Sequence, residues 1–122
     1  MFIEWFEGNA LPQSNISSVR KLGIMTFRIV VDPQQINEKD EEPRYRWGVV
    51  ELTPGLPKLG EIIAAIVRSR YSADDIEGIN NNYIYDGDTN KEHYDEWAEM
   101  QKWRQTAKSY AKELLKEMES IW

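Results

Sequence analysis

The first half of the chain has the hydrophobic pattern of β-strands. Apolar stretches rich in aromatic and β-branched residues occur at residues 2–6, 19–31 and 45–52. This enrichment is typical of strands. Asp32-Pro33 is expected to end the second stretch, because proline donates no hydrogen bond to a sheet ladder and restricts the residue before it. The polar residues 34–43 then predict a solvated loop, with the strands on either side antiparallel.

The period of the apolar residues changes after Pro57. Within 58–70 they recur at the i, i+3, i+4, i+7 spacing that places them on one face of a helix. These residues are Leu59, Ile62, Ile63, Ile66 and Val67. Ser72, followed by Asp74 and Asp75, has the form of a helix N-cap with an acidic first turn, and it predicts a second helix through residue 82.

A third and much longer helix is expected from residue 90 to residue 122. Thr89 and Glu92 have the spacing of a capping box, in which each side chain satisfies a free backbone donor. The apolar positions alternate spacings of four and three, with Trp97, Met100, Ala107, Leu114 and Met118 as the expected core. At 1.5 Å per residue this helix would be roughly 45–50 Å long, so we expect its C-terminal end to project or to pair with a partner.

Four residues of this helix are predicted to bind a partner. Trp103, Tyr110 and Trp122 fall at the edges of the apolar face, and tryptophan and tyrosine are enriched in interface hot spots. Arg104 interrupts the apolar seam; it either extends its stem across the face or pairs with a carboxylate such as Glu61 or Asp75. The spacing of three and four suits two packed helices, so self-association through the C-terminal helix is the simplest case.

These patterns together predict an α+β fold in one domain, residues 1–122. Residues 1–56 should form a small antiparallel sheet, and residues 57–122 should be mainly helical, including one long amphipathic helix. A ribbon of two strands is marginal alone, so helices must cover one face of the sheet.

Composition narrows the classes of function. The chain has 122 residues, no cysteine and a net charge of −6. The charge is uneven, since residues 72–99 contain nine acids against Lys91 alone. Nucleic-acid binding needs a basic footprint, which is missing. The start of the chain lacks the basic region of a signal peptide, and no apolar run is long enough to span a membrane. We therefore expect a cytoplasmic protein.

The motifs that carry chemistry are weak in this sequence. Asp86 to Asn90 begins like a calcium loop, but Lys91 and Trp97 stand where glycine and glutamate are required, which favours a turn. His93, the only histidine, is interpreted as a helix-face residue. A catalytic site would require Asp74 and Asp75 to converge with His93 or a tyrosine. We therefore expect no enzyme, no cofactor and no metal.

Two segments of the chain combine in a specific pattern. Residues 62–74 read I-x-x-x-I-V-R-x-x-Y-S-x-D, and an asparagine-rich turn and a W-R-containing helix follow. This arrangement resembles small proteins encoded in prophage tail regions, over residues 59–116. The resemblance brings no catalytic residues. It implies a role in tail or tail-fibre assembly, with later incorporation into a phage particle, or a role as an accessory structural protein.

The sequence thus favours a non-catalytic interaction or assembly protein. The alternative is a small-ligand binding module, which would need a concave, aromatic-lined pocket between the sheet and the helices.

Overall fold

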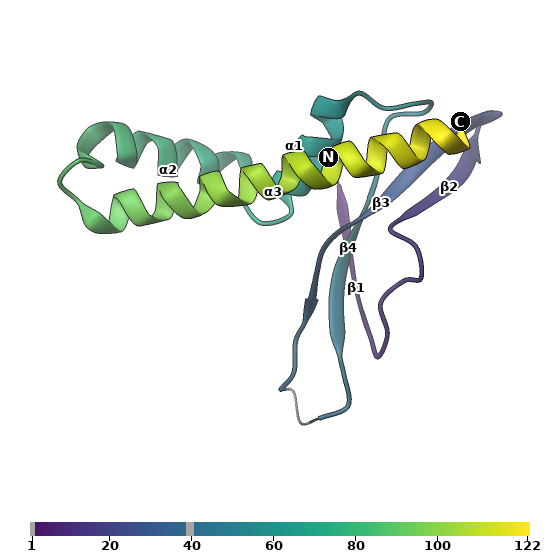
Figure 1. Ribbon diagram of the computed structural model, residues 1–122, viewed down its shortest axis with the longest axis horizontal. Helices are drawn as coiled ribbons and strands as arrows, with labels where there is room; N and C mark the ends of the chain where they lie inside the picture. The colour runs from purple at the N-terminus through teal and green to yellow at the C-terminus, as the bar shows by residue number, and fades with distance from the viewer. Residues whose placement is uncertain (1, 39–40) are drawn as a thin grey trace.

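The computed structural model of the protein describes residues 2–38 and 41–122 (Figure 1). In these residues a strand-rich first half is followed by helices, and the predicted α+β fold is confirmed. The elements are β1 (Ile3–Gly8), β2 (Ile16–Lys21), β3 (Ile24–Gln35), β4 (Tyr45–Glu51), α1 (Leu59–Arg68), α2 (Ala73–Asp86) and α3 (Lys91–Ile121). None of the helices in the described part of the chain is long and apolar enough to cross a membrane.

Within the described residues, the sheet has four antiparallel strands in the order β1-β4-β3-β2. Side chains alternate between the two faces of a strand. Phe27, Ile29 and Val31 of β3 therefore share one face, and all three are fully buried. The opposite face is polar at its centre, where Glu51 forms ion pairs with Lys21 and Arg28.

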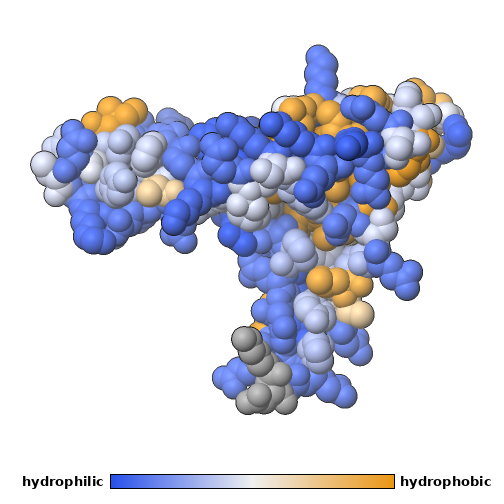
Figure 2. Space-filling view, viewed as in Figure 1, coloured by the Kyte–Doolittle hydropathy of each residue, from blue (hydrophilic) through white to orange (hydrophobic). Residues whose placement is uncertain are grey.

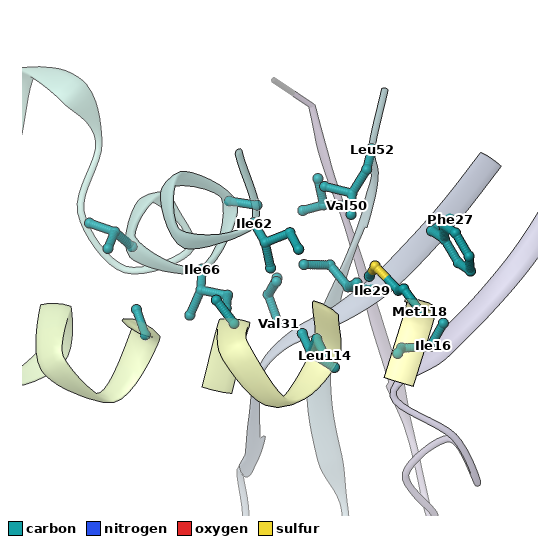
Figure 3. Packing of buried hydrophobic residues seen from close by; sticks show 14 residues of the cluster. Ile16, Phe27, Ile29, Val31, Val50, Leu52, Ile62, Ile66, Leu114 and Met118 are labelled. Carbon is teal, nitrogen blue, oxygen red and sulfur yellow. The ribbon is translucent and has the colours of Figure 1, made fainter. Parts of the chain in front are cut away.

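The core lies between this apolar face and the helices (Figure 3). Ile62 and Ile66 of α1 point into it from one side, and Leu114 and Met118 of α3 point into it from another. The sheet supplies the β3 side chains together with Ile16, Val50 and Leu52. Burial of side chains of this size provides about 1.5–3 kcal/mol each, which explains why the C-terminal half of α3 stays on the sheet.

Two local predictions for the strands are wrong. Residues 19–31 do not form one strand; the chain reverses at Leu22 and Gly23, whose φ angles are 52° and 80°. Positive φ at both central residues defines a tight two-residue hairpin, and leucine gives no signal for such a turn. β3 also does not end at Asp32-Pro33. It continues through a bulge between Val31 and Gln34, where the proline's missing donor is tolerated. Residues 39 and 40 of the predicted loop lie outside the described residues.

Two helix boundaries differ from the prediction. Ser72 forms the expected N-cap, in a capping box with Asp75, but α2 continues to Asp86. The N-cap of α3 is Asn90, one residue after the predicted Thr89, and its side chain accepts from the backbone N–H of His93. α3 has 31 residues, or roughly 46 Å at 1.5 Å per residue.

The part of α3 that projects is its N-terminal half. α2 packs beside this half, and the two form a helical hairpin that extends beyond the edge of the sheet (Figure 1). The C-terminal end was expected to project or to pair with a partner; it does not project, because the C-terminal half lies over the sheet and ends near β3 and β2. The part of α3 that extends beyond the sheet is therefore at the opposite end of the helix.

Leu114→Ala should lower the free energy of unfolding by about 2–5 kcal/mol, because Leu114 is buried between α1 and the sheet. Lys112→Ala, one half-turn away and exposed, should change it by less than about 0.5 kcal/mol. Denaturant melts of the two variants test this. Equal stability would mean that this stripe of α3 does not face the core.

Candidate functional site

The far end of the helical hairpin is held by stacked aromatic rings. Tyr83 of α2 stacks on Trp97 of α3, with ring centroids 4.0 Å apart and planes inclined by 7°. Tyr94 packs against both rings at tilted angles. Stacked aromatic pairs stabilise by about 0.5–1.5 kcal/mol beyond the area they bury. Trp97, predicted to lie in the core, thus serves to join α2 to α3.

One carboxylate completes the joint at the tip. Asp86, in the last turn of α2, accepts hydrogen bonds from His93 Nδ1 and from the side-chain amide of Asn90 at 3.3 Å. The hydrogen bond from His93 lowers the pKa of Asp86 below its ordinary value of 3.8. The same hydrogen bond, assisted by the nearby Glu96 and Glu92, raises the pKa of His93 above its ordinary value of 6.5.

These two shifts define a pH window for the pair. A raised histidine pKa contributes stability that is fully present below 6.5 and is lost as the pH rises through the raised value. A lowered carboxyl pKa contributes stability that is present above 3.8 and is lost as the pH falls through the lowered value. The pair of Asp86 and His93 therefore stabilises the tip of the hairpin most in mildly acidic solution, between the lowered pKa of Asp86 and the raised pKa of His93.

One face of α2 is exposed to solvent. All residues of α2 are described, and none is buried. Ile76, Ile79 and Tyr83 turn toward α3 and are partly covered. The side facing away from α3, which we call the outward face, consists of Glu77, Asn81, Ile84 and Tyr85. Ile84 is 79% exposed and Tyr85 is 87% exposed, and apolar surface is visible over this end of the hairpin (Figure 2).

A groove with an apolar floor lies where α1, α2 and α3 meet. Its volume is about 490 Å³. The floor is formed by Ile63, Ala64, Val67 and Ile76, and the rim by Arg68, Arg104 and Lys108. We call it the basic groove. Within residues 2–38 and 41–122, none of the three rim cations forms an ion pair.

An acidic groove lies on the other side of the helical hairpin. Asp74, Asp75, Glu96 and Glu99 line it, together with Arg70 and Tyr71. Glu99 and Lys108 are nine residues apart on α3, which places them about 180° apart around the helix. The carboxylate of Glu99 and the burial of the ring raise the pKa of Tyr71, with burial as the larger cause. The two sides of the hairpin thus carry opposite charge.

Two of the four predicted partner-binding residues are bound to the protein's own backbone. The indole N–H of Trp103 donates to the Val67 carbonyl at 3.3 Å, and Arg70 stacks on its ring at 3.8 Å. The Tyr110 hydroxyl donates to the Val30 carbonyl at 3.2 Å. Burial, followed by the charges of Glu117 and Glu113, raises the pKa of Tyr110 to about 12.

The other two predicted residues remain accessible. Trp122 is 59% exposed, although its ring also packs at a tilt against Phe27. Arg104 lies at the rim of the basic groove, and neither of the carboxylates considered for it is its partner. Glu61 accepts from Thr53, and Asp75 belongs to the cap of α2.

Sequence reasoning missed most of the basic groove. Lys108 follows Arg104 by one helical turn, so the pair could have been found from spacing. Arg68 belongs to a different helix, and only the packing of α1 on α3 brings it to the same rim.

Asp74 and Asp75 do not converge with His93, although they line the acidic groove together with Tyr71. Asp74 lies at the start of α2, whereas His93 lies beside Asp86 at its other end, about 18 Å away along the helix. In the described part of the chain, no group of three histidine, aspartate or glutamate side chains is placed to hold a metal ion.

Tyr110→Phe should lower the free energy of unfolding by about 0.5–1.5 kcal/mol, because it leaves the Val30 carbonyl without its donor. Chemical denaturation measures this difference. Lys112→Ala provides the exposed control on the same helix. A fully stable Tyr110→Phe variant would show that the hydroxyl does not support the fold.

Asp86→Asn should bring the pKa of His93 back down toward 6.5, since the amide cannot stabilise an imidazolium as a carboxylate does. The ring protons of this single histidine report its titration directly by NMR. Glu92→Gln should produce a smaller change in the same direction, because Glu92 acts only through its charge. An unchanged His93 titration in Asp86→Asn would contradict the pairing.

Comparison of the chain with protein-family models, with curated proteins and with solved structures gives no match. The similarity of residues 59–116 to prophage tail-region proteins therefore stays a prediction.

Proposed function

We propose that the protein is a non-catalytic interaction or assembly protein. The observation that carries this proposal is the projecting helical hairpin, in which the 14-residue α2 has no buried residue. Most helices in globular proteins derive their stability from packing one apolar face on a core. α2 packs its inner side mainly on α3, with Ile76 also against the core, and it exposes Ile84 and Tyr85 to solvent. Such a helix gains most from contact with another molecule.

The accessible predicted residues support the same role. Arg104 lies in a groove whose apolar floor and charged rim resemble the make-up of protein interfaces, and Trp122 is a half-exposed tryptophan. By contrast, Trp103 and Tyr110 are assigned to the fold because their polar atoms are bonded to the backbone. The partner surface we propose therefore comprises the hairpin, the basic groove and Trp122.

The setting of this role is the second part of the proposal. The similarity to prophage tail-region proteins favours assembly of a tail or tail fibre, beginning in the cytoplasm. A small-ligand function receives less support. The acidic groove has Tyr71 as its one aromatic lining residue, and the basic groove is lined by aliphatic and charged residues instead.

Photo-crosslinking tests the proposal in cells that produce the protein. A photoreactive phenylalanine analogue at Tyr85 or at Trp122 should form covalent adducts with a protein, because both side chains are exposed. The same analogue at Lys116, exposed on the C-terminal half of α3, is the control and should form fewer adducts. Mass spectrometry identifies the attached chain. An absence of adducts at both test positions would refute an interaction role for these surfaces.

A further inference from the structure

We propose that the basic groove of one molecule receives the outward face of α2 from a second copy of the chain. This inference rests on the proposed association role and names the partner. The groove and the outward face belong to the same hairpin, but they cannot meet within one molecule. The outward face points away from α3, whereas the groove lies on the α1 side of α3.

Charge favours this pairing. α2 contains four carboxylates and no basic residue, and Glu77 stands on its outward face. The rim of the groove contributes three cations, none with an ion-pair partner among the described residues. Complementary charge of this kind raises the rate of encounter and fixes the register of an interface.

Shape and hydrophobicity favour it as well. A helix laid into a groove between two other helices is a recurrent mode of recognition, with apolar anchors on one face of the bound helix. Ile84 and Tyr85 would supply these anchors, and Ile63 and Val67 lie in the floor that would receive them. Gly60 borders the groove, and a side chain added there would meet nothing within 4 Å, so this end is open.

The lengths of the two surfaces also agree. Glu77 and Ile84 are seven residues apart on α2, which corresponds to about 10 Å along a helix. Gln101 and Lys108, which mark the extent of the groove on α3, are separated by the same number of residues. A two-turn segment of α2 is therefore long enough to span the groove. Its acidic end is at Glu77, and its apolar end is at Ile84.

Sedimentation velocity of charge-reversed variants tests the inference. Wild-type protein should associate as its concentration rises. Arg104→Glu with Lys108→Glu reverses the groove, and Glu77→Lys with Asn81→Lys reverses the outward face. Each double variant should self-associate at least about tenfold more weakly, because like charges would then face each other. An equimolar mixture should associate again, since each variant keeps one native surface and the two altered surfaces are complementary.

Two controls separate the pairing from changes in net charge or in folding. Lys112→Glu with Lys116→Glu changes the net charge by the same amount as the groove variant but away from the groove, and it should associate like wild type. Ile84→Asp alters a side chain that is already 79% exposed, so it should keep the thermal transition of wild type while losing association.

A wild-type protein that is monomeric at all accessible concentrations would overturn the inference, and so would a mixture that stays monomeric. A monomeric protein whose position 85 crosslinks to a different chain in cells would leave the proposed interaction role intact. It would exclude only the second copy as the partner.

Discussion

The sheet is joined to the helices at one ion pair, Asp32 with Arg70. Asp32 lies in the bulge of β3 with a φ of 45°, and its nearly buried carboxylate accepts from Arg70 at 2.9 and 3.0 Å. The plane of the same guanidinium lies over the Trp103 ring, and the indole N–H of Trp103 donates to the Val67 carbonyl near the end of α1. Sheet, α1 and α3 therefore meet at one point. A guanidinium suits it, because it can pair with a carboxylate and stack on a ring at once.

Trp103 divides α3 into two parts that pack against different elements. Beyond Trp103 the apolar side chains lie on the sheet, and Leu114 and Met118 are buried there. Before Trp103 the same helix mainly supports α2, through the ring stack of Trp97 and the partly covered isoleucines, although Met100 there is fully buried. The two halves share one continuous backbone, so the rigid core fixes the direction in which the helical hairpin points. The helical hairpin of α2 and the N-terminal half of α3 therefore projects in a fixed direction, and we call it the arm.

The arm is the least supported part of the fold. α2 has a complete cap at its start, a ring stack near its end and the Asp86 hydrogen bonds at the tip, but no buried residue. Segments with few buried apolar contacts open with lower free energies than a core does. This property suits a surface that meets a partner, because contact can supply the stabilisation that the isolated arm lacks. The opposite charges on its two sides then give such a contact an orientation.

The sequence by itself determined the elements whose signals are local. The change of period after Pro57 predicted the passage from strands to helices, and Ser72 with Asp75 marked the start of α2, because periodicity and caps act within a few residues. The remaining features depend on contacts between residues that are distant in sequence. Leu22 and Gly23 turn because β2 and β3 pair, and Asp32 bulges where Arg70 meets it. The roles of Trp103 and Tyr110 were likewise set by carbonyls of α1 and β3, which no spacing along α3 could reveal. The basic groove forms only where α1, α2 and α3 pack together, so no pattern within a single helix predicts all of it.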